Sequence, residues 1–317
     1  MRQPVFVDTD ISLGTPGAEI DDGAAIIVLC NSPEVEIRGI SLVFGNVLVD
    51  LAHKNVCRLL SLLGREDIPV APGVAKSLVE DVAWSEEQAI WQSANHLPTP
   101  DWQVEKSEIQ GPDLLINTIR SAPGEITVLA LGPLTNLAIA LDRAPDIEKS
   151  VRQIIAMGGS FGKSPASAEF NIRNDPEAAR RVLQANWPIR LLGLEITHQV
   201  LFTRADFNSL DSTRPYLALL KGQAGQRIPL VEKMGWESGG CCLHDAIAVA
   251  TLLDEEIAEY IGTSLDVETQ PGARRGVTVF LPEESNQSAG RKMVAVSLNV
   301  TRCHSLIMDR MSGRAGI

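Results

Sequence analysis

The sequence predicts an α/β protein with a mostly parallel, doubly wound sheet. Short apolar segments rich in Val and Ile alternate with segments whose apolar residues recur at helical spacing. Such alternation is typical of strand–helix–strand units, in which helices cover both faces of the sheet. With 317 residues, of which 44% are hydrophobic and 21% charged, the chain can bury a large core. We therefore expect a single Rossmann-like domain over residues 1–317, with additional helices and a small antiparallel portion near the C-terminus.

The same alternation assigns the elements in chain order. Strands are predicted at residues 5–7, 37–43, 127–131, 153–157 and 189–194. The helices predicted between them span residues 23–30, 51–63, 114–120, 134–141 and 176–185. The last third is less regular and predicts a helix at 245–253 and antiparallel strands at 276–280 and 293–300. Residues 79–109 carry few strand or helix signals and predict a long loop or lid.

The composition excludes several classes of partner. The chain has 28 Lys and Arg against 40 Asp and Glu, so its net charge of −12 disfavours binding to nucleic acid or to anionic membranes. No apolar segment reaches the roughly 18 to 20 residues that span a bilayer, and the N-terminus shows no secretion signal. The cysteines lack a CxxC spacing, which indicates reduced thiols. We expect a cytoplasmic protein that acts on a small molecule.

Four carboxylates flank a Gly/Pro-rich loop in the segment VFVDTDISLGTPGAEIDDGAA. Asp8 and Asp10 end the first predicted strand, where residues two apart point to one face, and Asp21 and Asp22 open the first predicted helix. Helix capping explains Asp21 or Asp22 but not all four carboxylates. Like charges at this density raise one another's pKa unless a cation lies among them. The oxygen-only ligand set predicts a site for Ca²⁺ or Mg²⁺.

Further polar residues follow the other predicted strands, at the edge where doubly wound folds bind ligands. Asn46 closes the segment SLVFGN. Glu169 and Asn171, in SAEFNIRNDPEAA, have no evident structural role, and their carboxylate and amide groups suit a polyhydroxylated ligand. Asp175 precedes Pro176 at a helix start, so we assign it a capping role only.

The segment LHDAIAVATLL places His244 and Asp245 at the start of a helix. Asp245 is either an N-cap with an incidental neighbour or a functional residue, and these residues alone do not decide between the two. The sequence offers no partners for the other histidines, and it therefore indicates structural or surface positions for His53, His198 and His304.

Six motifs occur in an order and spacing that resemble one enzyme family. They are VDTD…IDDGAA, VFGN, LALGPLTNLA, IAMGGSF, AEFNIRNDPEAA and LHDAIAVA, and they extend from about residue 4 to residue 300. This set resembles the inosine-uridine nucleoside hydrolase family. The split Asp motif with the later His-Asp pair is the specific part, because a single Gly-rich motif would be a weak signal.

The resemblance implies Ca²⁺-dependent hydrolysis of the N-glycosidic bond of ribonucleosides, which releases ribose and a free base. By position, the carboxylates of Asp10, Asp22 and Asp245 and the backbone carbonyl of Leu131 would bind the cation. Asp10 would also take a proton from a Ca²⁺-bound water, which the cation makes more acidic. Carboxylates near the ribose would stabilise an oxocarbenium-like transition state, so no protein nucleophile is needed.

The resemblance implies roles for further residues. Asn46 would lie near the attacking water, and His244 would help the departing base to accept a proton. Asp21 and Asn171 would bind the ribose 2′- and 3′-hydroxyls, with Glu169 on the 5′-hydroxyl side and Met157 as a further substrate-binding residue. Membership would also imply nucleoside salvage and assembly as a homodimer or homotetramer.

The chain departs from the family pattern in three places. The Asn that usually precedes the Glu-Phe-Asn stretch has no evident counterpart in GGSFGKSPASAEFN. Residues 11–20 separate the two Asp motifs, which form a continuous DTDPGIDD in family members. The family's His-Gly-Glu lid motif is absent, and WSEEQAIWQSANHLP occupies its region. There, Trp84 and Trp91 could stack on a nucleobase or form a satellite hydrophobic cluster. The base preference therefore stays open.

Three competing interpretations have different consequences. VFVDTD also looks like the Asp-x-Asp opening of haloacid-dehalogenase phosphatases, which use Mg²⁺ and an aspartyl nucleophile, but these would leave the IDD pair and the His-Asp helix unexplained. A non-catalytic ribose-binding relative would not require the water-activating carboxylates. A hydrolase of a different N-riboside would retain every motif and is harder to exclude.

Overall fold

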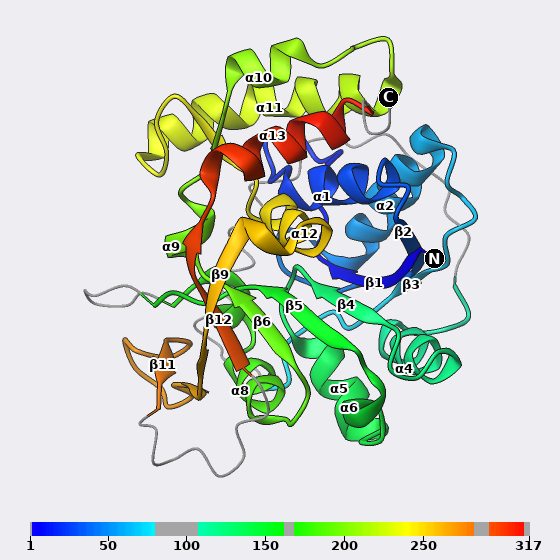
Figure 1. Ribbon diagram of the computed structural model, residues 1–317, viewed down its shortest axis with the longest axis vertical. Helices are drawn as coiled ribbons and strands as arrows, with labels where there is room; N and C mark the ends of the chain where they lie inside the picture. The colour runs from blue at the N-terminus through cyan, green and yellow to red at the C-terminus, as the bar shows by residue number, and fades with distance from the viewer. Residues whose placement is uncertain (1, 80–106, 162–167, 282–291, 314–317) are drawn as a thin grey trace.

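The computed structural model describes residues 2–79, 107–161, 168–281 and 292–313. Its centre is an eight-stranded sheet (Figure 1), ordered β3 (Val70–Pro72), β2 (Val35–Leu42), β1 (Gln3–Thr9), β4 (Thr127–Ala130), β5 (Gln153–Met157), β6 (Ile189–Leu192), β12 (Lys292–Leu298) and β9 (Ala258–Thr263). Neighbouring strands are parallel except for the antiparallel β12–β9 pair. The order 3-2-1-4-5-6 is that of the doubly wound fold, so the predicted fold class is confirmed.

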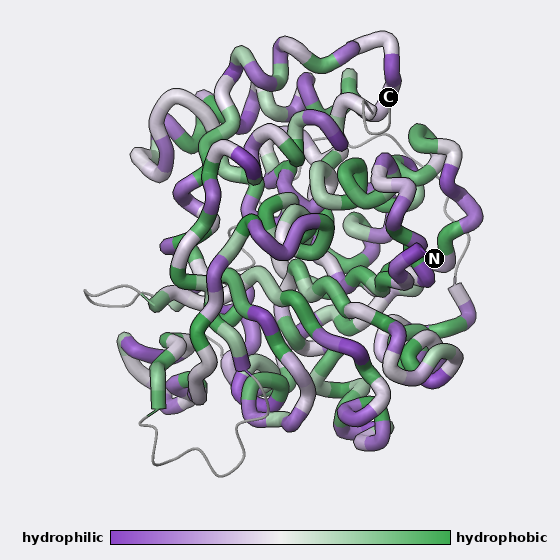
Figure 2. Tube along the Cα trace, in the orientation of Figure 1, coloured by the Kyte–Doolittle hydropathy of each residue, from purple (hydrophilic) through white to green (hydrophobic). Residues whose placement is uncertain are grey.

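Helices cover both faces of this sheet (Figure 1). One face carries α1 (Asp21–Cys30), α2 (Val49–Leu63), α11 (Pro215–Met234), α12 (His244–Leu253) and α13 (Val300–Met311). The other face carries α4 (Gly111–Ser121), α5 (Thr135–Arg143), α6 (Ile147–Ser150) and α8 (Pro176–Gln184). Each face has its own hydrophobic core, and Figure 2 shows hydrophobic residues along the central strands. Because the strands are covered on both faces, most of their residues are apolar.

Short elements complete the described fold. The strands β7 (Leu201–Thr203) and β8 (Gly240–Cys242) form one antiparallel pair, and β10 (Leu265–Val267) and β11 (Thr278–Phe280) form another. The short helices are α7 (Phe170–Asn174), α9 (Leu194–Thr197), α10 (Arg204–Ser209) and the 3₁₀ turn η1 (Glu255–Ile257). Among the described residues, no helix is long and apolar enough to cross a membrane.

The C-terminal third differs from the prediction in part. The antiparallel strand predicted at 293–300 is β12, which is antiparallel to β9, in agreement with the prediction, and is also parallel to β6. Strand direction depends on which distant strand lies alongside, and a local pattern does not contain this information. The long helix α11 was not predicted, because Pro229 and two glycines interrupt its helical pattern.

The sheet reverses its winding between β1 and β4, which are neighbours although more than a hundred residues separate them in the chain. The connections that follow these two strands run to opposite faces of the sheet. This opens a crevice at the carboxyl ends of the strands. Asp10 follows β1, and Leu131 follows β4, so both lie at this position.

Candidate active site

The two Asp motifs lie on either side of the connection from β1 to α1. Asp10 follows the last residue of β1, and Asp21 and Asp22 are the first two residues of α1. The N-cap position belongs to Ile20, and no side-chain hydrogen bond caps this helix. Capping therefore does not explain Asp21 or Asp22, although both lie where the helix dipole favours negative charge.

Four buried carboxylates converge at the carboxyl end of the sheet. Side-chain oxygens of Asp21, Asp22 and Asp245 lie within 4.8 Å of one another. The Asn46 backbone N–H donates to Asp10 Oδ2 at 2.7 Å, and the Asn46 side-chain amide donates to Asp22 Oδ2 at 3.2 Å. Residues from three distant parts of the chain are thus joined in one cluster.

Burial raises the pKa of every carboxyl group in this cluster. Loss of hydration is the largest cause throughout, and it raises the pKa of Asp21 to about 8, with the neighbouring Asp22 charge adding to the effect. The pKa of Asp22 is raised to about 6, and those of Asp10 and Asp245 are raised well above the usual range. Such a cluster is costly to ionise unless positive charge is supplied.

The unsatisfied atoms of the cluster fit a hard cation. Asp10 Oδ1 and Asp21 Oδ1 are buried and have no hydrogen-bond partner among the described residues. Both are carboxylate oxygens, the ligand type that Ca²⁺ and Mg²⁺ prefer. The cluster can therefore hold a divalent cation.

Close approach of the loop after β2 depends on a glycine. A Cβ atom built on Gly45 would lie 1.9 Å from Asp10 Oδ2. Any larger residue would displace the Asp10 carboxylate or the loop, and with it the Asn46 N–H bound to Asp10. This steric requirement explains the Gly-Asn pair of the VFGN motif.

Asp8 does not share the environment of Asp10, contrary to the expectation from strand alternation. Its Oδ1 accepts hydrogen bonds from the Ser41 hydroxyl and, at 2.7 Å, from the Asn136 amide. The same amide donates to the Leu42 carbonyl at 2.9 Å. Asp8 thus joins β1, β2 and α5.

The opposite wall of the site comes from α7 and the ends of β4 and β5. Glu169 is the N-cap of α7 and accepts backbone N–H groups from Asn171 at 2.8 Å and Gly159 at 3.0 Å. The expectation that Glu169 has no structural role is therefore wrong. The Asn171 amide donates to the carbonyls of Leu131 at 2.8 Å and Met157 at 3.2 Å, which brings these predicted residues together.

His244 begins α12, as the sequence predicted, and its ring is held by Thr197. His244 Nδ1 lies 2.8 Å from Thr197 Oγ1, and this hydroxyl in turn donates to the Gly193 carbonyl at 3.4 Å. With the Thr197 hydroxyl donating to the Gly193 carbonyl, the tautomer that fits this contact has its proton on Nδ1 and leaves His244 Nε2 as a lone-pair acceptor. Burial lowers the pKa of His244 to about 3, so the imidazole is neutral in this arrangement.

Two histidines that the sequence left without partners have them. The rings of His198 and His244 meet edge to face, with centroids 5.0 Å apart. His304 lies 3.4 Å from the Asp206 carboxylate and stacks on Phe202. These contacts join residues far apart in the chain, so no local pattern could have indicated them.

The site opens into a cavity of about 720 Å³. The predicted residues that line it are Asp21, Asn46, Leu131, Met157, Glu169, Asn171, His244 and Asp245. Asp10 and Asp22 lie behind this lining, where both contact Asn46. Trp84 and Trp91 lie outside the described residues. A second cavity, of about 560 Å³, lies at the opposite edge of the sheet and contains none of the candidates.

One wall of the cavity was missed by the sequence analysis. It contains Glu19, Arg227, Trp236 and Glu237. The Arg227 side chain is only 5% exposed, pairs with Glu19 and lies over the Trp236 ring at 5.6 Å from its centroid. These residues come from the loop before α1, from α11 and from the segment that follows α11, and none of these segments carries a recognisable motif.

The connection over residues 11–20 is a packed part of the fold. Gln223 of α11 accepts the Gly14 N–H at 2.7 Å and donates to the carbonyls of Ser12, Ala18 and Glu19 at 3.3, 3.2 and 3.1 Å. Gly14 has a φ of +118°, a conformation that side chains disfavour. Gln223 therefore fixes the loop that presents Glu19 to the cavity.

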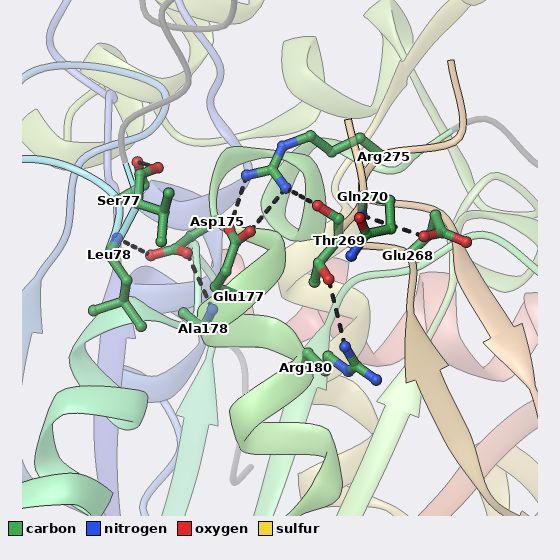
Figure 3. A network of polar contacts seen from close by, with 11 residues as sticks. Ser77, Leu78, Asp175, Glu177, Ala178, Arg180, Glu268, Thr269, Gln270 and Arg275 are labelled. Carbon is green, nitrogen blue, oxygen red and sulfur yellow. Dashed lines mark hydrogen bonds and ion pairs between the residues drawn. The ribbon is translucent and has the colours of Figure 1, made fainter. Parts of the chain in front are cut away.

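Asp175 has the capping role that the sequence predicted. It is the N-cap of α8 and accepts the N–H groups of Ala178 at 3.0 Å and Leu78 at 2.9 Å (Figure 3). Its neighbour Glu177 pairs with Arg275 through two contacts of 2.8 Å. This network anchors α8 to the segment before β11.

Comparison with known proteins supports one family for the whole chain. The model of the inosine-uridine preferring nucleoside hydrolase family matches residues 5–305. The chain is 35% identical to the probable uridine nucleosidase 2 of Arabidopsis thaliana, with 98% of each chain covered. It is 32% identical to the pyrimidine-specific ribonucleoside hydrolase RihA of Citrobacter koseri, with 88% of each chain covered.

Solved structures agree with these sequence matches. A plant nucleoside hydrolase, PpNRh1, superposes with a TM-score of 0.83 at 31% identity, covering 98% of this chain and 99% of that chain. A purine-preferring ribonucleoside hydrolase from Gardnerella vaginalis gives a TM-score of 0.83 at 27% identity, with 98% of each chain covered. The phosphatase alternative is not supported. The chain belongs to the inosine-uridine preferring nucleoside hydrolase family and is an enzyme that hydrolyses the N-glycosidic bond of ribonucleosides.

Proposed function

We propose that this hydrolase uses Ca²⁺ bound by the carboxylates of Asp10, Asp22 and Asp245 and by the Leu131 carbonyl. The observation that carries this proposal is the buried cluster of carboxylates with unpartnered oxygens on Asp10 and Asp21. When bound, the cation supplies positive charge to the cluster and lowers the pKa of water held there.

Asp10 is the general base of the proposed reaction. Its Oδ2 is fixed by the Asn46 N–H at 2.7 Å, while its Oδ1 is free of other described contacts and can take a proton from the attacking water. Asn46 therefore has a positioning role, because it orients both Asp10 and Asp22.

The ribose binds against the carboxylates and amides that line the cavity. Asp21 and Asn171 accept and donate hydrogen bonds to the 2′- and 3′-hydroxyls, and Glu169 lies toward the 5′-hydroxyl, with Met157 beside it. As the glycosidic bond breaks, positive charge develops on the ribose. The surrounding carboxylates stabilise this charge and make a protein nucleophile unnecessary.

The nucleobase departs on the side of His244. In the described hydrogen-bond arrangement His244 Nε2 is an acceptor, so assistance to the leaving base requires the ring to change its protonation. We propose uridine as the first substrate, since the curated relatives with 35% and 32% identity are named for uridine and pyrimidine nucleosides. One structural relative is named as purine-preferring, so inosine and adenosine are the substrates to compare with uridine.

The cellular setting is a further proposal. The cysteines are free thiols, which suits a reducing compartment such as the cytoplasm. Nucleoside salvage there, by a homodimer or homotetramer, is the role that we propose. Light scattering of the purified protein measures the oligomer directly.

A substrate panel tests the proposed function. Purified protein with Ca²⁺ is incubated with uridine, cytidine, inosine and adenosine, and ribose and free base are measured separately. We expect equimolar ribose and base, with uridine among the good substrates. Release of neither product from any nucleoside, or release of base only from another N-riboside, would reject the proposed substrates.

A further inference from the structure

A second group of metal-ligating side chains lies in the wall of the cavity, apart from the acidic cluster. It consists of His198, Glu237 and His244. We propose that these three residues form a site for a transition-metal ion, with Zn²⁺ as its occupant, and that binding there inhibits the enzyme. The metal site stands on its own geometry, whereas the inhibition rests on the proposed function.

The three ligand atoms already lie close together. One nitrogen or oxygen from each residue lies within 4.8 Å of the others, and His244 Nε2 is 4.0 Å from Glu237 Oε1. Ligands bound tetrahedrally at about 2.1 Å from Zn²⁺ are roughly 3.4 Å apart, so each side chain needs to move by only about 1 Å. His198 is exposed and free to make this adjustment.

Two of the ligands are held in position by their neighbours. The Thr197 hydroxyl accepts the Nδ1 proton of His244, which directs the Nε2 lone pair away from it and toward Glu237. The Cys242 backbone N–H donates to Glu237 Oε2 at 2.9 Å, which leaves Oε1 on the side of His244. Outer contacts of this kind orient the ligands of known metal sites.

The donor set differs in kind from that of the acidic cluster. Two imidazole nitrogens and one carboxylate suit Zn²⁺ or Co²⁺, whereas Ca²⁺ prefers oxygen ligands. The Arg227 cation pairs with Glu19 and also interacts electrostatically with Glu237, so a bound metal ion would share the charge of Glu237 with Arg227. The two sites therefore select different metals within one cavity.

An ion at this site would obstruct the reaction in two ways. It would engage His244 Nε2, the atom that faces the departing base in the proposed mechanism, and it would occupy space in the cavity. We expect inhibition by Zn²⁺ that excess nucleoside relieves.

Metal binding can be measured without any assay of activity. Ca²⁺-loaded protein is titrated with Zn²⁺ by calorimetry and with Co²⁺ by visible spectroscopy. We expect one additional equivalent of metal, no release of Ca²⁺ and the intense absorption of tetrahedral Co²⁺. His198→Gln and Glu237→Gln should each abolish the Co²⁺ spectrum. Thr197→Val, which removes only the outer hydrogen bond, should weaken Zn²⁺ binding about 10- to 100-fold.

His304→Gln is the matched control, since His304 also faces a carboxylate, Asp206 at 3.4 Å, but has no third ligand among the described residues. It should bind Zn²⁺ as the wild type does. Equal Zn²⁺ binding by His198→Gln, or uptake of Zn²⁺ only with release of Ca²⁺, would overturn the proposal. A His198-dependent Co²⁺ spectrum in protein that hydrolyses no nucleoside would support the metal site and reject the proposed function alone.

Discussion

Among the single residues of the site, Asp10 lies in an environment that suits a general base. One carboxylate oxygen is fixed by the Asn46 N–H, and the other has no partner among the described residues. We predict that Asp10→Asn lowers kcat by about 10²- to 10⁴-fold for every nucleoside, because attack by water requires this base whatever the leaving group. Steady-state kinetics with metal analysis of the same samples measures this. If the Ca²⁺-loaded Asp10→Asn variant has a kcat within a few-fold of the wild type, Asp10 is not the general base.

His244 should act on the leaving group and not on the water. A nitrophenyl riboside releases a stable phenolate, so His244→Ala should cleave it nearly as fast as the wild type. Natural nucleosides have poorer leaving groups, and we predict that their kcat falls by about 10²-fold or more. Parallel rate measurements on the two substrate types decide this. Equal losses on both would show that His244 acts in binding or in orienting Asp245.

Some roles and contacts of single residues could not be predicted from the sequence. The motif residues that the resemblance assigned do meet around the cavity, since order and spacing carry that information. The capping role of Glu169 was missed because Glu is not a typical N-cap residue. The contacts of His198 with His244 and of Arg227 with Glu19 depend on the packing of distant segments, and no local pattern records them.

At the scale of elements, the loop over residues 11–20 depends on α11. Gln223 makes four hydrogen bonds to this loop, three of them buried and one partly buried. We predict that Gln223→Ala lowers the free energy of unfolding by about 2 to 4 kcal/mol, since each such bond contributes about 0.5 to 1.5 kcal/mol. Denaturant unfolding measures this change.

Gln226→Ala is the matched control for that variant. Gln226 lies on the same helix but makes a single exposed bond, to the Gly17 N–H at 3.1 Å. We expect Gln226→Ala to lower the free energy of unfolding by less than about 1 kcal/mol. Similar losses for the two variants would show that α11 does not hold the loop through Gln223.

The strand–helix alternation predicted β1, β2, β4, β5 and β6 with the helices between them, because buried parallel strands are short and mostly apolar. It failed for α11, whose Gly222, Gly225 and Pro229 lower helix propensity while tertiary contacts maintain the helix. It predicted β12 as antiparallel, which holds for the pairing with β9, but it did not indicate the parallel pairing with β6. Register and direction are set by the neighbouring strand, and β6 lies about a hundred residues away in the chain.

At the scale of the whole molecule, the fold brings distant carboxylates to the crevice between β1 and β4. Asp10 follows β1, Asp22 lies on α1 and Asp245 lies on α12, which packs against α1. Each carboxylate is buried at a cost that the proposed cation would offset. The metal site and the fold are therefore expected to depend on each other, and removal of the metal should lower the melting temperature as well as the activity.

We predict that one Ca²⁺ in this cluster is required for hydrolysis. This prediction is tested by measuring bound metal, melting temperature and ribose release from uridine on the same protein before chelation, after chelation and after addition of Ca²⁺. We predict about one Ca²⁺ per chain, loss of ribose release and a lower melting temperature on chelation, and recovery of both with Ca²⁺. Full ribose release from protein that metal analysis shows to be free of divalent ions would contradict the account.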